Sequence, residues 1–407
     1  MTKRTDTRQV VCGGVPIGGG APIAVQSMTN TFTEDVVTTA AQISELYKAG
    51  ADIVRVAVPT QEAARAIAKI KARLEDSGIV VPIVADIHFD YRIAIEAIRN
   101  GADKIRINPG NIGDAERLKM VADAAGLAGI PMRIGVNSGS LESDLRELYD
   151  REPAAALVES ALRNVSLVRR TGFDNIVISI KSSNVVTNAE AHRLLAESTD
   201  LPLHIGITEA GYGEAGLIKS AVGIGALLAM GIGDTLRVSL TGDPLREVAA
   251  AQDILHAVNL LPGQITLISC PTCGRCRVDL AALCNEVSEA LKTIESERIQ
   301  AARRSSRCKV FGNYNSSTPE DSKVSLDTYR RTSVINQAEI RENNAFRPIT
   351  VALMGCAVNG PGEASQADFG IACGPDGGVF FEKGIKGETI PTDQIVQILI
   401  LRMKFLS

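Results

Sequence analysis

Tryptophan is absent from the 407 residues of this chain, and Phe, Trp and Tyr together make up only 4% of it. Proteins that bind nucleic acids by stacking bases need such rings, so their scarcity disfavours that class. A surplus of one charge is also lacking, because 43 Lys and Arg face 47 Asp and Glu and leave a net charge of −4. We therefore expect neither nucleic acid nor an anionic membrane as a partner.

Long apolar runs are missing too. The longest uncharged apolar stretch lies between Lys219 and Asp234 and holds 14 residues, whereas a membrane-spanning helix needs about 20. The charged start, Met1 to Asp6, leads into no apolar core typical of a signal peptide. We expect a cytoplasmic protein, in which the eight cysteines are more typical of metal or redox chemistry than of disulfides.

Eight apolar runs rich in β-branched residues recur along the first part of the chain at a spacing of about 30 residues, the length of a βα unit. They begin at Ala24, Ile53, Pro82, Lys104, Met132, Ile176, Leu203 and Thr235. Ala-rich helical stretches such as 61–74 and 154–169 separate them. Strands that alternate with helices indicate a parallel sheet. Eight such units predict a TIM-type (β/α)8 barrel over residues 1–262, with an open doubly wound sheet as the rival.

Charged side chains stand at the ends of these runs. Because side chains alternate along a strand, Lys104, Arg106 and Asn108 share one face. Barrel enzymes bind substrates at the carboxyl ends of their strands. We therefore predict that five cations meet in one mouth: Arg55, Arg106, Arg133, Lys181 and Arg237. With Asp86 and Glu209 as the acids there, a surplus of three positive charges favours a compact substrate with at least two phosphate charges.

After residue 262 the pattern changes, and we expect a smaller α+β domain over residues 263–407. It opens with Cys270, Cys273 and Cys276 in the spacing C-x-x-C-x-x-C. Zinc knuckles, redox dithiols and iron–sulfur loops share the C-x-x-C spacing. A second loop, 355–363, is rich in Gly and Pro and carries Cys356 and Glu363. Such a loop favours a close approach of backbone to a cofactor over core packing.

Seven strings together carry a family resemblance: VADIHFDYRIA, KIRINPGNIG, RIGVNSGSL, LHIGITEAG, GIGDTLRVSL, ISCPTCGR and MGCAVNGPGEA. In this order they resemble the 4-hydroxy-3-methylbut-2-enyl diphosphate synthases, iron–sulfur enzymes of the non-mevalonate isoprenoid route. The resemblance covers roughly residues 8 to 298 and 348 to 404. It implies an oxidoreductase with a TIM-barrel substrate domain followed by an iron–sulfur domain.

The resemblance also implies a reaction. The substrate would be 2-C-methyl-D-erythritol 2,4-cyclodiphosphate and the product 4-hydroxy-3-methylbut-2-enyl diphosphate. Two electrons would arrive one at a time through one 4Fe-4S cluster per chain, from reduced ferredoxin or flavodoxin. The family further implies a homodimer in which the cluster domain of one subunit caps the barrel mouth of the other.

Site residues follow from the same resemblance, position by position. The implied cluster ligands are Cys270, Cys273, Cys356 and Glu363. A carboxylate ligand that leaves an iron would open it to the substrate, so Glu363 also has a catalytic role. Glu209 would deliver a proton as the hydroxyl group leaves. The residues implied in substrate positioning are Arg55, Asp86, His88, Arg106, Asn108, Arg133, Asn137, Lys181, Arg237 and Ser239.

Two departures from the family pattern stand out. Cys276 replaces a residue that is usually not a ligand, and Cys373 replaces a usual glycine, which leaves an all-cysteine cluster open. A polar insertion at about 298–347 separates the two cysteine loops, with ten Lys and Arg against five Asp and Glu. We expect an exposed loop there, and a docking surface for an acidic electron carrier is the sharper hypothesis.

Two other classes of protein remain open at this stage. One is a barrel with a structural zinc knuckle formed by Cys270, Cys273, Cys356 and Cys373. The other is a barrel similar to the pterin-diphosphate transferases, whose mouth also binds anions. The second hypothesis leaves the cysteine loops without a role.

Overall fold

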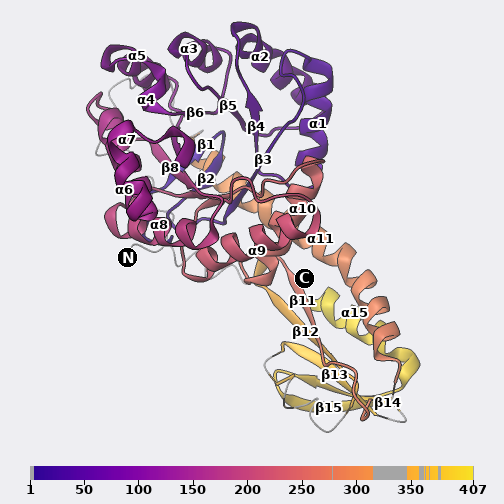
Figure 1. The fold of residues 1–407 in the computed structure, drawn as a ribbon. Helices are drawn as coiled ribbons and strands as arrows, with labels where there is room; N and C mark the ends of the chain where they lie inside the picture. The colour runs from indigo at the N-terminus through magenta and orange to yellow at the C-terminus, as the bar shows by residue number, and fades with distance from the viewer. Residues whose placement is uncertain are drawn as a thin grey trace. The chain divides into compact units, whose positions relative to one another are not determined.

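The computed structural model describes residues 4–276, 278–314, 346–356, 362, 364–365, 367–374 and 377–406. The chain forms two compact units, one made mainly of the residues up to Leu260 and the other mainly of the residues from Leu261 onward. Among the described residues, no helix is both long and apolar enough to cross a membrane. Each unit has its own sheet and its own helices (Figure 1).

The first unit is a closed parallel barrel, as predicted. Its strands pair in the order β8-β7-β6-β5-β4-β3-β10-β9, and a parallel bridge between Ile178 and Leu203 joins the two ends. The eight strands are β3 (Ala24–Met28), β4 (Ile53–Ala57), β5 (Ile83–Asp86), β6 (Lys104–Ile107), β7 (Met132–Asn137), β8 (Ile176–Lys181), β9 (His204–Ile205) and β10 (Thr235–Leu236). Each begins within two residues of its predicted start.

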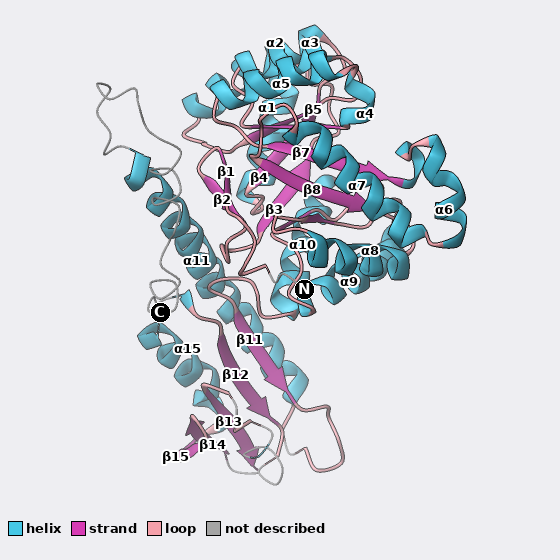
Figure 2. Cartoon of the chain, turned by 90° about the vertical axis from the view of Figure 1, so that its left-hand side faces the viewer, coloured by secondary structure: helices cyan, strands magenta, loops and turns pink. Residues whose placement is uncertain are grey.

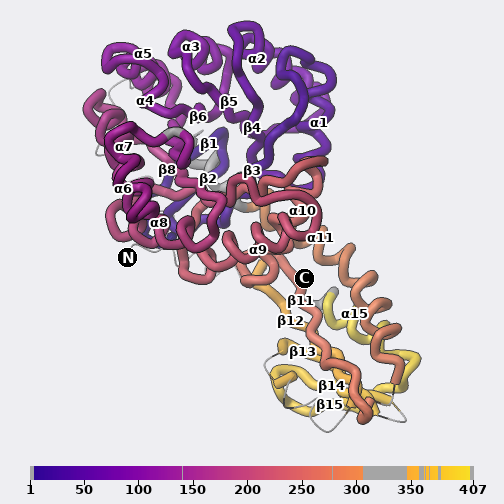
Figure 3. The backbone as a smooth tube through the Cα atoms, viewed as in Figure 1, coloured from indigo at the N-terminus to yellow at the C-terminus, as the bar shows by residue number. Residues whose placement is uncertain are grey.

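Helices surround the strands, and the tube in Figure 3 follows the chain once around the barrel. They are α1 (Val36–Lys48), α2 (Gln61–Asp76), α3 (Tyr91–Arg99), α4 (Pro109–Ile112), α5 (Ala115–Leu127), α6 (Arg146–Arg151), α7 (Pro153–Arg169), α8 (Val185–Ser198), α9 (Gly213–Ala229) and α10 (Pro244–Ala257). The helix α2 illustrates why they form. Thr60 caps its first turn by accepting a hydrogen bond from the Ala63 amide, and Ile67, Ile70 and Leu74 form a buried stripe at helical spacing.

A short hairpin closes the amino end of the barrel. It consists of β1 (Val10–Cys12) and β2 (Val15–Ile17), joined by two glycines with positive φ, as a two-residue hairpin turn of this kind requires. Its apolar side chains pack in one cluster with Ala24, Ile53 and Val84 at the start of the barrel strands. Any opening for a substrate therefore lies at the other end.

The second unit is a five-stranded sheet with two helices on one face, seen in Figure 2. The strands are β11 (Ile265–Ser269), β12 (Ile349–Met354), β13 (Phe369–Gly374), β14 (Gly377–Glu382) and β15 (Ile385–Ile390), and the helices are α11 (Leu280–Tyr314) and α15 (Ile395–Leu406). The first three strands are parallel and the last two antiparallel. Apolar residues from both helices share one core cluster with β12 and β13.

The expected exposed loop at 298–347 is partly wrong. The helix α11 continues to Tyr314, so the first part of this stretch is helical. Arg298 is buried, and its guanidinium donates hydrogen bonds to the carbonyl oxygens of Gly263 and Arg347 at 3.3 and 3.1 Å. A buried arginine that satisfies two backbone carbonyls fixes both ends of the insertion. The rest of this prediction, 315–345, lies outside the described residues.

A buried histidine predicts a pH-dependent stability. His192 on α8 is fully buried, and burial lowers its pKa from 6.5 to about 4. The unfolded chain then binds more protons than the folded one between these values, so the free energy of unfolding falls as the pH drops from 6.5 to about 4. The His192 contribution over this range is about 3 kcal/mol.

The test compares His192→Leu with the parent chain in urea unfolding at several pH values between 7 and 4. A variant is needed because burial raises the pKa of Asp234 to about 6, which changes the stability in the opposite direction over the same range. The difference between the two proteins isolates His192. An unchanged pH profile in the variant contradicts the prediction.

Candidate active site

Asp86 is the centre of the polar network at the carboxyl ends of the barrel strands. The register places Ala57 of β4 and Arg106 of β6 beside it. One carboxylate oxygen lies 3.2 Å from Arg106 Nη1, and the other lies 3.7 Å from Arg55 Nε and 3.6 Å from His88 Nε2. The structure thus brings together four residues that the sequence predicted for the mouth.

Charge decides the protonation state of this network. Burial disfavours the ionised form of Asp86, but Arg55, His88 and Arg106 outweigh it and hold the pKa of the carboxyl group well below its usual range. For Arg55, the effect of burial is larger than the effect of the neighbouring charge. Burial lowers its pKa to about 10, although the charge of Asp86 opposes this shift. The carboxylate is therefore a fixed anion that orients two arginines.

Arg133 has no such partner among the described residues. Arg133 is 2% exposed, and its Nε and Nη1 atoms have no hydrogen-bond partner among the described residues. Burial, together with the neighbouring Arg55 and Arg106, lowers the pKa of Arg133 well below its usual value. Burial and Arg237 act in the same way on Lys181. Buried donors that repel one another are stabilised by a polyanion that binds between them.

Two inward-facing glycines leave room for the long side chains. A Cβ atom at Gly135 would lie 2.9 Å from Arg106 Nε. A Cβ atom at Gly206 would lie 2.6 Å from the carbonyl oxygen of Arg237 and 3.4 Å from Lys181 Nζ. Because real side-chain contacts are not this short, both positions need glycine for the basic side chains to adopt these conformations.

Glu247 belongs to the site and was missed by the sequence analysis. It lies in the first turn of α10, is buried, and places a carboxylate oxygen 3.3 Å from Arg237 Nη2. It also accepts a hydrogen bond from the Leu240 amide at 2.9 Å. An acidic residue in a first turn is ordinary, so the sequence held no signal for it. It adds a third acid to the predicted Asp86 and Glu209.

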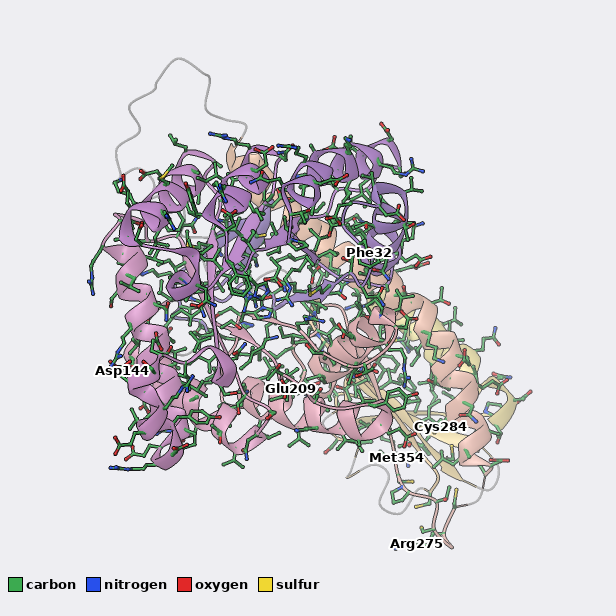
Figure 4. All side chains as sticks on the ribbon, turned by 45° about the horizontal axis from the view of Figure 1, so that its top comes forward. Phe32, Asp144, Glu209, Arg275, Cys284 and Met354 are labelled. Atoms are coloured by element: carbon green, nitrogen blue, oxygen red, sulfur yellow. The ribbon has the colours of Figure 1, made fainter. Side chains whose placement is uncertain are left out.

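Glu209 lies on the loop from β9 to α9, where Figure 4 labels it. It is exposed and has a φ of +51°, a conformation that residues other than glycine rarely adopt. Such backbone strain concentrates at functional sites. His88 is likewise exposed. Both side chains are therefore accessible to a substrate at the mouth.

The predicted amides and hydroxyl occupy the same end of the strands. Asn108 follows β6, is buried, and caps α4 by accepting a hydrogen bond from the Gly110 amide at 3.1 Å. It therefore has a structural contact besides its predicted role. Asn137 ends β7 and is half-buried, and Ser239, two residues beyond Arg237, is half-buried as well.

Lys104 and His204 lie deeper inside the barrel than the mouth residues, because each begins its strand, β6 and β9. Both are fully buried, and Lys104 Nζ and both ring nitrogens of His204 have no hydrogen-bond partner among the described residues. Burial lowers the pKa of Lys104 to about 8, and the nearby Arg133 adds to this shift. The alternation of side chains had placed Lys104 on the face of Arg106, but it was not among the predicted site residues.

In the second unit, cysteines gather at the carboxyl ends of two adjacent parallel strands. Ser269 of β11 pairs with Leu353 of β12, so Cys270 and Met354 follow side by side. The Gly355 amide donates a hydrogen bond to Cys270 Sγ at 3.2 Å, and Cys356 comes next along the chain. The first residues of the two predicted loops therefore lie side by side at the carboxyl ends of β11 and β12.

Cys273 is exposed in the turn that follows, where Figure 4 labels Arg275. A hydrogen bond from the Arg275 amide and one from its side chain lower the pKa of the Cys273 thiol. A lowered thiol pKa favours the thiolate, which is the form that binds metals. Among the described residues, no three His, Cys, Asp or Glu side chains are grouped closely enough to hold a metal ion. The predicted ligand Glu363 lies outside the described residues.

Comparison with protein families identifies both units. The model of the GcpE TIM-barrel domain matches residues 7–252, which is more than half of the chain, and that of the GcpE protein C-terminal domain matches residues 317–404. The chain belongs to the GcpE family. This confirms the family resemblance and the TIM-type barrel that the sequence predicted.

Individual relatives agree with the GcpE assignment. One from Caldanaerobacter subterraneus is 47% identical over 394 residues, which are 97% of this chain and 95% of the relative. One from Desulfotalea psychrophila is 44% identical over 410 residues, covering 100% of this chain and 97% of the relative. Both bear the name 4-hydroxy-3-methylbut-2-en-1-yl diphosphate synthase (flavodoxin). A dihydropteroate synthase structure from Stenotrophomonas maltophilia aligns with 61% of this chain and 96% of its own at 19% identity and a TM-score of 0.46.

Proposed function

We propose that this protein reduces 2-C-methyl-D-erythritol 2,4-cyclodiphosphate to 4-hydroxy-3-methylbut-2-enyl diphosphate, in the non-mevalonate route to isoprenoids. The observation that carries the proposal is the barrel mouth, where five basic side chains face three acids and where buried Arg133 has donors without a hydrogen-bond partner among the described residues. A compact diphosphate supplies the missing negative charge and accepts these hydrogen bonds. Relatives named for this product over nearly their full length support the same reaction.

The cofactor in this proposal is one 4Fe-4S cluster per chain, which supplies electrons one at a time when it is bound. Cys270, Cys273 and Cys356 would hold it, with Glu363 as the fourth ligand. The chemistry of the donor set supports this, because Cys270 and Cys356 follow adjacent strands, Cys273 lies in the turn after Cys270, and a backbone amide already points at Cys270 Sγ. Amides aimed at sulfur are typical of iron–sulfur sites.

The chain's own residues bind and orient the substrate. Arg133, Lys181 and Arg237 would hold the oxygens of the diphosphate, since arginine forks match phosphate geometry. Asp86 is a positioning residue that keeps Arg55 and Arg106 in place through its two oxygens. Glu209 would donate the proton that the departing hydroxyl group needs, because its accessible carboxyl group lies on a mouth loop.

The assembly in this proposal is a homodimer in which the iron–sulfur unit of one subunit covers the barrel mouth of the other. Three rings on the loops of the mouth support it. Phe32 follows β3, Phe89 follows β5 and Tyr212 follows β9, and they are 84%, 72% and 75% exposed. Exposed rings around a polar centre are typical of surfaces that another protein covers.

Flavodoxin is the proposed electron donor, because it appears in the names of the relatives. Ferredoxin, the other donor that the resemblance implies, differs in its cofactor and is the natural comparison in an assay. The hypothesis that the insertion binds the donor stays a prediction, since residues 315–345 lie outside the described part of the chain.

The test is anaerobic purification followed by iron, sulfide and zinc analysis, and by turnover of the cyclic diphosphate with reduced flavodoxin. We expect about four irons and four sulfides per chain, with a broad visible absorption band from sulfur-to-iron charge transfer. We also expect conversion of the cyclic diphosphate to the linear product. One zinc ion, no visible band after reconstitution with iron and sulfide, and no turnover would instead favour the structural zinc knuckle.

A further inference from the structure

The fold brings together the two cysteines that depart from the family pattern. Cys276 ends the turn after β11, and Cys373 lies near the end of β13, almost a hundred positions later. Neither belongs to the proposed ligand set. In the structure both are free thiols, and both belong to the contacts of one core cluster of the second unit.

The sheet register fixes the position of Cys373. Met354 of β12 pairs with Ala372 of β13, so Gly355 and Cys373 are the next residues on two neighbouring strands. Adjacent strands lie about 4.8 Å apart. Cys373 is fully buried, and it packs on the same face of the sheet as Leu353 and Ile371.

Cys276 reaches the same place from the turn. A Cβ atom at Gly355 would lie 2.4 Å from Cys276 Sγ and 3.2 Å from a methyl carbon of Leu280. The Cys276 sulfur therefore occupies the space that the missing side chain of Gly355 leaves, and the register places Cys373 on the strand next to Gly355. Its thiol donates a hydrogen bond to the carbonyl oxygen of Val278 at 3.2 Å, which holds it there.

Electrostatics supports this proximity. Burial raises the pKa of Cys373 to about 11, and the largest electrostatic contribution to the shift comes from Cys276. Cβ atoms of a disulfide lie about 3.5–4.5 Å apart. A sulfur that sits at the Cβ position of the neighbouring strand residue is within reach of Cys373 by rotation of the two side chains.

We propose that Cys276 and Cys373 form a redox-active dithiol, which a hydroperoxide oxidises to an intramolecular disulfide. In the first step the Cys276 thiol loses its proton, and the thiolate attacks the peroxide to give a sulfenic acid and hydroxide, which takes up that proton as water. In the second step the Cys373 sulfur attacks the sulfur of the sulfenic acid and forms the disulfide bond. The hydroxide of the sulfenic acid takes up the proton of the Cys373 thiol and leaves as water. The two thiols lose two electrons, and hydrogen peroxide is reduced to two molecules of water.

The order of the two steps follows from exposure. Cys276 is half-buried and lies in a turn, so the peroxide reaches it before it reaches Cys373. Cys373 has no exposed surface and resolves the sulfenic acid from the inside. The product ties the turn after β11 to β13 and leaves Cys270, Cys273 and Cys356 as thiols. The inference does not depend on the proposed function, because it concerns residues outside the proposed ligand set.

The test treats the full chain, purified anaerobically, with one equivalent of hydrogen peroxide and then counts thiols after denaturation. Eight cysteines are present, so we expect the thiol count to fall from eight to six per chain and to return with dithiothreitol. The variants Cys276→Ser and Cys373→Ser should each lose this paired reaction. Cys284→Ser is the matched control, because Cys284 packs against the same core cluster; it should lose two thiols as the parent chain does.

Peptide mapping of the oxidised parent chain gives a second readout that needs no variant. Trypsin cleaves after Arg275 and Arg277 and so separates Cys276 from Cys273. A second protease that is specific for aspartate cleaves at Asp368 and separates Cys373 from Cys356. We expect a linked pair that contains Cys276 and Cys373. A link from Cys276 to Cys270, a lasting sulfenic acid at Cys276, or no loss of thiols overturns the proposal.

Discussion

Replacing Asp86 with asparagine is expected to lower the free energy of unfolding by about 3 to 5 kcal/mol, the usual cost of removing one partner from a buried ion pair. The variant keeps the size of the side chain but loses the only negative charge within 4 Å of Arg55 and Arg106 among the described residues. Both arginines then repel each other and the buried Arg133, and only the more distant Glu247 still opposes the repulsion at Arg55. Urea unfolding measures the loss, as a lower midpoint with an unchanged slope.

An added anion should reverse much of this effect. We expect pyrophosphate to bind the folded mouth and not the unfolded chain, and so to raise the stability by mass action. We expect the rise to be larger in Asp86→Asn than in the parent chain, because the variant has one more uncompensated positive charge. Equal rises in both proteins would contradict the electrostatic account of the mouth.

Arg133→Met is the matched control, in which we expect the free energy of unfolding to change in the opposite direction. It removes a buried cation whose Nε and Nη1 have no hydrogen-bond partner in the part of the chain that the structure describes, and replaces it with an apolar chain of similar length. We expect the free energy of unfolding to rise by about 1 to 4 kcal/mol. Affinity for the cyclic diphosphate should fall by at least about 2 kcal/mol, or roughly thirtyfold. A variant that loses stability would show that Arg133 acts mainly through packing.

Replacing Glu209 with glutamine is expected to lower kcat by about 10² to 10⁴, the usual contribution of a positioned proton donor. The amide keeps the shape of the side chain and the backbone strain at φ +51°, but it has no proton to give. The side chain is exposed, so the unfolding midpoint should stay the same. Steady-state turnover with reduced flavodoxin, measured across pH, gives the effect.

The pH profile separates a proton donor from a residue that only positions the substrate. Loss of a donor removes the alkaline limb of the kcat profile, where deprotonation of the donor stops turnover. Loss of a contact to bound substrate instead raises KM and leaves the profile unchanged. Glu214, which is exposed in the first turn of α9, provides a matched control. Glu214→Gln should leave kcat unchanged, and an equal loss in both variants would remove Glu209 from its proposed role.

The position of the mouth residues could be predicted from the sequence because it depends on two local rules. Strand period fixes the face of each side chain, and parallel strands bring their carboxyl ends to one edge. Asp86, Arg55 and Arg106 needed no more than this to be placed together. Glu247 could not be found in the same way, since its contact with Arg237 depends on how α10 packs on the strands.

For the cysteines, what the sequence shows and what the tertiary structure adds are more clearly separate. The spacing of Cys270, Cys273 and Cys276 in the sequence indicates a metal or redox loop by itself. It cannot show that Cys373 lies near Cys276, because the two are almost a hundred positions apart in the chain. The register of β12 and β13 decides this by setting Cys373 beside Gly355, whose missing side chain leaves room for the sulfur.

By itself the sequence determined the family, the barrel and the residue types of the mouth, because each of these follows from local periodicity or from a contiguous motif. Only the tertiary structure decided which charges are paired. Among the described residues, it places three basic side chains around Asp86 and leaves buried donors of Arg133 without a hydrogen-bond partner. The physical reason is that burial and distance set the strength of a charge interaction, and both depend on residues that are remote in sequence.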